Sequence, residues 1–214
     1  MTNNIKNNIT LVDNIYWPTR SLHTLTPTKQ TLKMFESLEP FLKNKNTMVQ
    51  AGGNCGLTIK PFITQFKHIY TFEPEPTNFL CLCLNVTEDN VYKIQSCLGN
   101  NHNLVDLGFI GDDCGSAHIN KSGNIPTLKI DDLNLNDCDL IMLDIEGYEL
   151  YALMGAEQTI LKYKPLICVE VYNDWMNRYN YSYPDLFNYL DNFGYKAVNA
   201  YRTYYSIDVI FSSI

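Results

Sequence analysis

Three acidic residues stand at the end of one short apolar run. Residues 140–143 have the composition of a buried β-strand, and Asp144, Glu146 and Glu149 follow it closely. In open α/β sheets, ligands bind in the crevice beyond the carboxyl ends of the strands. Carboxylates in that position can orient or deprotonate a hydroxyl group. The run therefore predicts a ligand-facing site rather than an ordinary solvated surface.

A glycine-rich loop follows a second apolar run, residues 47–51, and contains Gly52, Gly53 and Gly56. Glycines at such a point let the backbone turn tightly and approach a ligand closely. Glu73 ends the next β-rich run, at the spacing from the loop where an acid can bind the two ribose hydroxyls of a nucleoside. Loop and acid together predict a nucleoside cofactor.

Two cofactor classes could use this loop and acid. NAD needs the fingerprint G-x-G-x-x-G, which places a helix N-terminus against a pyrophosphate, whereas residues 52–56 read G-G-N-C-G. S-adenosylmethionine has no pyrophosphate to bind. The loop therefore favours S-adenosylmethionine, and an NAD-dependent Rossmann oxidoreductase stays as the alternative.

The elements that carry these residues alternate between short β-rich runs and segments that can hold a helix, which is typical of a parallel, doubly wound α/β sheet with helices on both faces. Residues 195–199 and 206–211 are joined by too short a link for a crossover helix, so they predict a closing antiparallel hairpin. That ending is more typical of nucleoside-binding methyltransferases than of dehydrogenases. The other five predicted strands are 47–51, 68–72, 91–97, 140–143 and 166–171.

Two further segments complete this Rossmann-like, mostly parallel seven-stranded fold. Between its third and fourth strands, 116–130 alternates around the turn-forming 121–124 and predicts an inserted β-hairpin. Residues 1–27 look irregular, and 29–42 has helical spacing that Pro40 shortens. We expect one domain, 46–214, preceded by a flanking segment and helix, 1–45.

Composition excludes several classes of protein. The chain has 214 residues and a formal net charge of −7, with no long basic cluster, so we expect no nucleic-acid partner. No stretch has the length of a membrane span and the polar N-terminus is unlike a signal peptide, so we expect a cytoplasmic protein that binds no membrane. Seven cysteines without a C-x-x-C pair predict free, mostly buried thiols rather than a zinc site.

Five motifs in sequence resemble those of the FkbM family of S-adenosylmethionine-dependent methyltransferases. They are QAGGNCG (50–56), TFEPEPTNF (71–79), TLKIDDL (127–133), LDIEGYELYALMGA (143–156) and PLICVE (165–170). Two positions depart from the family pattern, because Gln50 stands where an acid is usual and Gly53 where alanine is usual. Gln50 brings no charge to the methionine end of the cofactor, so a catalytically inactive cofactor-binding module is a further alternative.

The resemblance implies a role for each matching position. The glycine loop would line the methionine and ribose end of S-adenosylmethionine, Glu73 would bind the ribose hydroxyls, and residues 96–98 would lie along the adenine. The implied cofactor-binding residues are Gln50, Gly52, Gly53, Asn54, Gly56, Glu73, Pro74, Cys97, Leu98 and Asp144.

Methyl transfer requires the acceptor to be aligned with the S–CH₃ bond and its proton to be removed. We expect Asp144 to orient or deprotonate an acceptor hydroxyl, with Glu146 as the second catalytic residue and Glu170 as the third. Glu149 is predicted to be a helix-start residue, placed where a carboxylate favours the positive end of the helix dipole. His118, in the inserted hairpin, is a weaker candidate base.

The acceptor is expected to be a small molecule or glycan that offers a sugar hydroxyl, a substrate class that rests mainly on the resemblance. Trp175 and neighbouring tyrosines are candidates for an aromatic acceptor pocket, as opposed to ordinary surface packing. Asp144, Glu170 and Asn173 also permit a Mg²⁺ site, but no metal is included in the expected cofactors. The sequence leaves the oligomeric state open.

Overall fold

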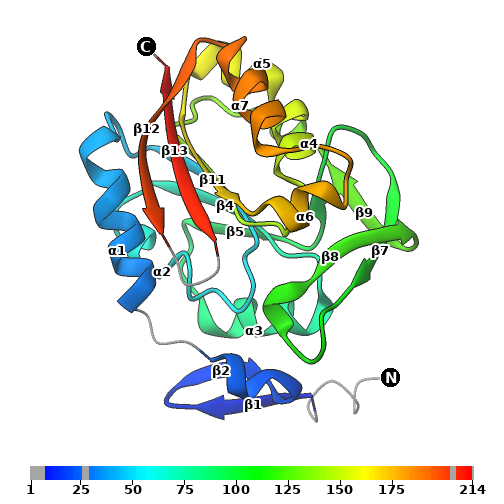
Figure 1. Cartoon of the computed structure of the whole chain (residues 1–214). Coiled ribbons are helices and arrows are strands. Elements are labelled where there is room, and N and C mark those ends of the chain that lie inside the picture. Colours follow the sequence, from blue (N-terminus) through cyan, green and yellow to red (C-terminus); the bar gives the residue numbers. More distant parts are fainter. Residues whose placement is uncertain (1–7, 26–28, 203–205, 214) are drawn as a thin grey trace.

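A seven-stranded sheet forms the centre of the computed structural model, which describes residues 8–25, 29–202 and 206–213. Its strands are β3 (Thr47–Ala51), β4 (His68–Phe72), β5 (Val91–Ile94), β10 (Leu140–Leu143), β11 (Leu166–Val171), β12 (Tyr195–Arg202) and β13 (Ile207–Ser213). Their order in the sheet is β12-β13-β11-β10-β3-β4-β5 (Figure 1). The order reverses at β3, which lies between β4 and β10, and such switch points are where open α/β sheets bind ligands.

The mostly parallel sheet predicted from the sequence is confirmed. β3, β4, β5, β10 and β11 run parallel to one another. The C-terminal strands β12 and β13 pair antiparallel, as predicted, and β13 is also antiparallel to β11. β3 and β10 are buried at every residue, because a strand covered by helices on both faces needs apolar side chains at successive positions.

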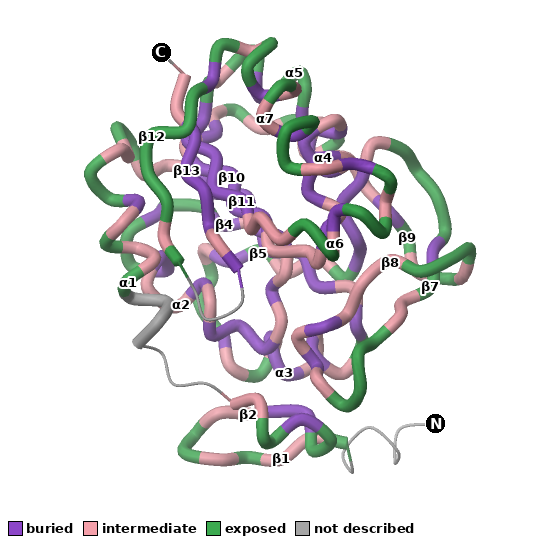
Figure 2. Tube along the Cα trace, in the orientation of Figure 1, coloured by how far each residue is buried: buried purple, intermediate pink, exposed green. Residues whose placement is uncertain are grey.

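Helices cover both faces of this sheet. α1 (Lys29–Leu38), α2 (Lys60–Ile63) and α3 (Pro76–Asn85) bury Leu38, Phe62 and Leu82 against one face. α4 (Glu149–Met154), α5 (Glu157–Tyr163) and α7 (Tyr183–Asp191) cover the other face through Leu153 and Leu186, among others. In Figure 2 the inner strands are buried along most of their length, whereas β12 is an exposed edge. None of the described helices has the length and apolar character needed to cross a membrane.

The prediction for residues 116–130 is wrong in its pairing. β8 (His118–Ser122) and β9 (Ile125–Leu128) both exist, but β7 (Leu104–Gly108) lies between them and pairs antiparallel with each. The predicted third strand is also too long, because the chain leaves the main sheet after Ile94 and residues 97–98 form β6, which pairs with β9. The insertion is thus a second sheet of order β6-β9-β7-β8 beside the main one (Figure 1).

Three local predictions also need correction. Residues 9–18 are not irregular but form the hairpin β1 (Ile9–Val12) and β2 (Ile15–Pro18), joined by two residues with positive φ, Asp13 and Asn14. Such φ values are those of a type I′ turn, whose twist matches that of paired strands. The helix expected over 29–42 ends at Leu38 and continues as the 3-10 turn Glu39–Phe41, which contains Pro40. The helix expected after Glu149 breaks into α4 and α5 at Gly155.

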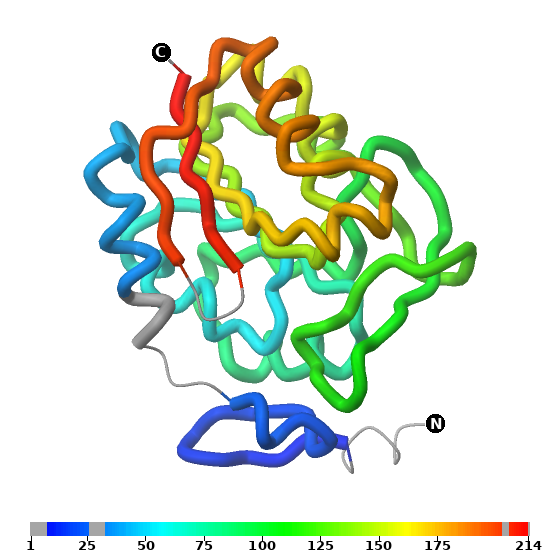
Figure 3. Tube along the Cα trace, in the orientation of Figure 1, coloured from blue at the N-terminus to red at the C-terminus, as the bar shows by residue number. Residues whose placement is uncertain are grey.

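The N-terminal hairpin is fastened to α3 by one side chain. Asn85 accepts a hydrogen bond from the Tyr16 N–H at 2.7 Å, and its amide donates to the Tyr16 and Cys55 carbonyls, both at 2.8 Å. Figure 3 shows the hairpin, in dark blue, at one end of the molecule. Asn85 therefore joins the hairpin, α3 and the glycine loop.

We expect Asn85→Ala to lower the free energy of unfolding by about 1–3 kcal/mol, because it leaves partly buried backbone groups without partners. Urea unfolding measures the loss, and limited proteolysis should cut the N-terminal hairpin sooner in this variant. Asn188→Ala, on the exposed side of α7, is the control and should change stability by no more than about 0.5 kcal/mol. Equal stability of the two variants would contradict the fastening role of Asn85.

Candidate functional site

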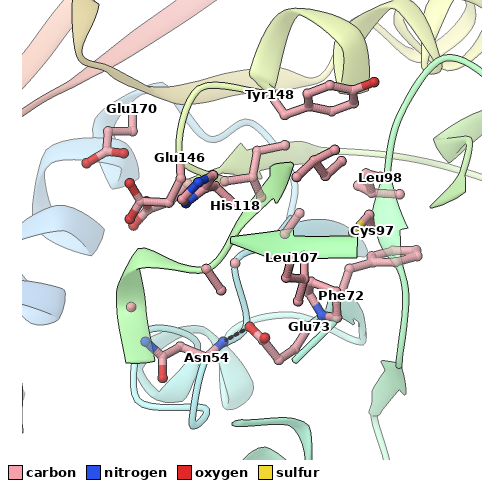
Figure 4. A pocket seen from close by; sticks show the side chains of 18 of the residues that line it. Asn54, Phe72, Glu73, Cys97, Leu98, Leu107, His118, Glu146, Tyr148 and Glu170 are labelled. Atoms are coloured by element: carbon pink, nitrogen blue, oxygen red, sulfur yellow. Dashed lines mark hydrogen bonds between the residues drawn. The ribbon is translucent and has the colours of Figure 1, made fainter. Parts of the chain in front are cut away.

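A pocket opens at the carboxyl ends of β3, β4, β10 and β11, where the sheet order reverses (Figure 4). The main sheet and the insertion line it together, since Leu107 and His118 face residues from the strand ends. Most of the residues predicted from the sequence meet here. Those that line the pocket are Gly52, Asn54, Glu73, Pro74, Cys97, Leu98, Asp144, Glu146 and Glu170.

The structure places Gln50, Gly53 and Gly56 beneath the pocket rather than in its lining. Gln50 is 1% exposed, and its amide accepts a hydrogen bond from the Thr71 hydroxyl and donates to the Ala51 carbonyl. A Cβ on Gly53 would lie 2.8 Å from Thr71 Oγ1, and one on Gly56 would lie 2.9 Å from a side chain of α3. All three residues pack the loop against the sheet and α3.

Glu73 is held in place by the loop that it faces. Its carboxylate accepts hydrogen bonds from the N–H groups of Asn54 at 2.7 Å and Glu75 at 2.9 Å. Burial, opposed by these hydrogen bonds, raises the pKa of Glu73 to about 8. The N–H groups of Gly52 and Gly53 donate to the carbonyl of Phe72. These contacts fix the ends of β3 and β4 relative to each other and direct one carboxyl group toward the pocket.

The loop after β3 touches the strand end that carries Asp144. Gly52 has φ +84°, and a Cβ there would lie 1.9 Å from the Asp144 carbonyl oxygen. No side chain fits at that distance, so glycine is required both by the backbone conformation and by the close approach. This contact places the glycine loop directly beside the strand end that carries Asp144.

Three carboxylates gather at that tip. One oxygen from each of Asp144, Glu146 and Glu170 lies within 4.8 Å of the other two. Glu146 adopts a left-handed backbone conformation with φ +59°. Such a conformation costs a non-glycine residue on the order of 1–3 kcal/mol and persists where the surroundings impose it. The backbone at Glu146 is therefore locally strained in the conformation that places its carboxyl group in the cluster.

Glu149 imposes that loop conformation. It is fully buried as the first residue of α4, which confirms its predicted position. Its Oε1 accepts the N–H groups of Ile145 and Gly147, each at 3.1 Å, and its Oε2 accepts the Tyr181 hydroxyl at 3.1 Å. The carboxyl group thus holds the loop before the helix by hydrogen bonds. The sequence predicted only a helix-start position and not this role.

Burial makes the carboxyl groups of this region hard to ionise. Desolvation, together with the charges of nearby acids, raises the pKa of Glu146 to about 9 and the pKa of Glu149 to about 7. The pKa of Asp144 is also raised by burial, and that of Glu170 lies well above its usual range because of burial and the neighbouring Asp144. Within the described residues, no lysine, arginine or histidine forms an ion pair with any of these four acids.

His118, the weaker candidate base in the sequence, lines the pocket. Its Nδ1 lies 2.9 Å from the Ser116 carbonyl oxygen and must donate to it, which leaves Nε2 with a free electron pair. Burial lowers the pKa of His118, so the ring is neutral at pH 7. In Figure 4 the ring is drawn beside the Glu146 side chain. No spacing in the sequence indicated this, because the insertion brings His118 to the strand ends.

The aromatic residues near the site are arranged differently from the prediction. Trp175 does not line the pocket, and its ring packs edge-to-face on Tyr172 with the guanidinium of Arg178 4.5 Å from its ring centre. Tyr148 lines the pocket instead and stacks on Tyr151, with ring centres 4.8 Å apart. The backbone of Trp175 contributes by packing against the loop at Gly147.

Other predicted features can be placed as well. Asn173 is exposed and outside the pocket lining, so Glu146 takes its place in the acidic group. Asn78 is buried and donates to the Cys114 carbonyl at 2.8 Å. The prediction of free thiols is confirmed, because all seven cysteines are unpaired and all but Cys83 are buried.

The buried acids predict an unusual dependence of stability on pH. A carboxyl group whose pKa is raised on folding binds more protons in the folded state, so its stabilisation is lost as the pH rises toward the folded pKa. We expect the free energy of unfolding in urea to fall between about pH 5 and pH 9 in metal-free buffer, the interval between ordinary carboxyl pKa values and that of Glu146.

Glu146→Gln removes one of these groups and should flatten that decline. Glu157→Gln, an exposed residue of α5, should leave the pH dependence unchanged. A free energy of unfolding that rises over this interval would contradict the assignment of raised pKa values to the buried acids.

Comparison with known proteins agrees with this geometry. The model of the methyltransferase FkbM domain matches residues 62–197, more than half of the chain. Among solved structures, the methyltransferase FkbM from Methylobacillus flagellatus KT has a TM-score of 0.58 and 20% identity, over 78% of this chain and 43% of that protein. The chain thus spans less than half the length of that relative. No curated protein sequence matches the chain.

Other solved methyltransferases share the fold at lower identity. The ribosomal protein L11 methylase from Lactobacillus delbrueckii subsp. bulgaricus has a TM-score of 0.56 and 9% identity, over 88% of this chain and 80% of that one. The magnesium protoporphyrin IX methyltransferase ChlM from Synechocystis PCC 6803, solved with bound SAM, has a TM-score of 0.52 and 10% identity, over 87% and 79%. The sequence match over 62–197, on a methyltransferase-like fold, shows that the chain belongs to the FkbM methyltransferase family.

Proposed function

We propose that this chain transfers a methyl group from S-adenosylmethionine to a hydroxyl group of a sugar or glycan. One observation carries the proposal: a single pocket joins the glycine loop and Glu73 to the acidic cluster of Asp144, Glu146 and Glu170. The first part suits a nucleoside, and the second suits a hydroxyl acceptor. Gly52 sets the two parts in contact.

The residues present fit S-adenosylmethionine. Glu73 directs a carboxyl group into the pocket, where it can accept the ribose hydroxyls, and Gly52 and Asn54 of the glycine loop line the pocket beside it. Cys97 and Leu98 offer an apolar edge to a flat base. The methyl donor is S-adenosylmethionine, which supplies a methyl group already made electrophilic by the sulfonium. The chain itself must therefore orient the acceptor and remove its proton.

The proton acceptor that the site supports best is His118. The sequence favoured Asp144 for this role, but burial raises the pKa values of Asp144 and Glu146 and so favours their protonated forms, which cannot accept a proton. His118 is neutral, carries a free electron pair on Nε2 and is fixed by its hydrogen bond to Ser116. In this mechanism, Asp144, Glu146 and Glu170 position the acceptor hydroxyl and His118 takes its proton.

A groove beside the pocket suits a sugar. Tyr148 and Ile119 line both the pocket and this groove, which Tyr151, Tyr179 and Arg178 extend along the insertion. Tyrosine faces can stack on sugar rings, and polar side chains around them can hydrogen-bond sugar hydroxyls. The groove thus supports a glycan acceptor whose reactive hydroxyl enters the acidic pocket.

Binding measurements separate this proposal from its alternatives. In calorimetry, S-adenosylhomocysteine should bind and NAD should not, and binding of NAD alone would overturn the proposed cofactor. Glu73→Gln should weaken the binding of S-adenosylhomocysteine about tenfold, because the NH2 group of glutamine cannot accept a ribose hydroxyl or the N–H groups of Asn54 and Glu75 that the carboxyl group accepts. Glu88→Gln, on an exposed loop, is the matched control and should bind as the parent does.

Kinetics test the base. His118→Gln should lower kcat by about 10²–10⁴ in an acceptor panel and remove the acidic limb of the pH profile, while S-adenosylhomocysteine still binds. His102→Gln, an exposed histidine paired with Asp132, is the control and should keep both the rate and the profile. An unchanged pH profile in His118→Gln would contradict His118 as the base and would favour one of the carboxylates instead. Binding without methyl transfer to any acceptor would favour an inactive module.

A further inference from the structure

The acidic cluster has the composition of a cation site. Asp144, Glu146 and Glu170 each bring one carboxylate oxygen to within 4.8 Å of the other two. They come from the ends of two neighbouring strands, since β10 and β11 pair in parallel with Leu143 opposite Val169. Three carboxylates that converge in this way repel one another unless protons or a cation neutralise them.

A fourth acid lies next to one member of this cluster in the sheet. Asp208 lies directly opposite Glu170 in the antiparallel pair of β11 and β13, so both side chains stand on one face of the sheet. Asp208 is only 4% exposed, and its Oδ2 has no hydrogen-bond partner.

Hydrogen bonds satisfy only part of this group, since Glu170 is hydrogen-bonded to the side chains of Asp144 and Ser206. Glu146 Oε2 is also buried without a hydrogen-bond partner. Buried polar atoms in folded proteins almost always have partners, so two orphaned carboxylate oxygens beside one cluster indicate a missing ligand. Of the ion pairs among the described residues, none involves Asp144, Glu146, Glu170 or Asp208.

We propose that Asp144, Glu146 and Glu170 bind a hard divalent cation of the Mg²⁺ or Mn²⁺ class, with Asp208 as an outer carboxylate. The class follows from the donors, which are all oxygens, without the histidine or cysteine that zinc prefers. Three carboxylates leave coordination positions open for water or for an acceptor. Because the cluster lines the pocket, those open positions face the proposed methyl-transfer site.

The role of the cation rests on the proposed function. When the acceptor oxygen binds beside the cation, its proton is more acidic and passes to His118 Nε2. The oxygen then attacks the methyl carbon, so that an O–C bond forms as the S–C bond breaks and S-adenosylhomocysteine leaves. With the cation bound, the carboxylates would be ionised, but their electron pairs would bind the cation and would not be free to take the acceptor's proton.

Metal binding can be measured without any methyl acceptor. The full chain is freed of metal with a chelator, saturated with S-adenosylhomocysteine and titrated with Mn²⁺, and free Mn²⁺ is followed by electron paramagnetic resonance. We expect one saturable site per chain that Mg²⁺ competes for. Glu170→Gln should lower the affinity for Mn²⁺ at least about tenfold, since even the loss of a residue that only supports a metal ligand has effects of this size. Asp208→Asn should lower this affinity less, and Glu36→Gln, at an exposed residue of α1, should leave it unchanged.

A second measurement guards against misfolded variants. Mg²⁺ should raise the unfolding midpoint of the parent and of Glu36→Gln, and it should leave that of Glu170→Gln unchanged, because only a bound ligand stabilises the folded state. S-adenosylhomocysteine should bind all of these variants. Absence of saturable Mn²⁺ binding to the parent, or parental affinity in Glu170→Gln, would show that the acids share protons instead and would overturn the site.

The outcomes also distinguish this site from the proposed function. If methyl transfer persists in chelator and no Mn²⁺ binds, the proposed methyltransferase activity is supported and the cation site is contradicted. Saturable Mn²⁺ binding that Glu170→Gln abolishes, without methyl transfer to any acceptor, would retain the cation site and discard the proposed reaction.

Discussion

The close contact between Gly52 and the Asp144 carbonyl is the constraint on which the site depends. A side chain at residue 52 would lie 1.9 Å from that oxygen, so the two strand ends could not approach with any other residue there. Because β3 and β10 are neighbours at the switch point of the sheet, this contact also fixes where the glycine loop and the acids meet. One backbone contact thus determines that a nucleoside and an acceptor would lie side by side.

Desolvation at that position disfavours the ionised forms of the acids, and contacts of the surrounding chain hold their backbone in place. Glu149 binds the loop through two N–H groups, and Gly147, with φ +99°, lets the loop pack on the backbone of Trp175. Glu146 is consequently held in a left-handed conformation. Rigid carboxylates that cannot turn away from one another form a preorganised site, which suits a cation or a hydroxyl that must be placed accurately.

Much of this could be predicted from the sequence because it depends on local pattern. Apolar runs that end in acids located β10 and β11, and the spacing of the glycine loop and Glu73 predicted two parts of one pocket. The inner position of β7, the burial of Gln50 and the place of His118 could not be predicted in this way. Each depends on contacts between segments far apart in the chain, such as the hydrogen bonds by which Thr127 holds residues 101 and 103.

The segment before the family match also shapes the pocket. Ser21 is buried, donates to the Asp112 carbonyl and accepts the Cys114 N–H at 2.7 Å. Cys114 lines the pocket, and its thiol lies 3.7 Å from Asn54 Oδ1 in the glycine loop. The N-terminal segment therefore holds the insertion against the glycine loop. Since His118 belongs to that insertion, its position in the pocket depends on residues that lie outside the matched domain, 62–197.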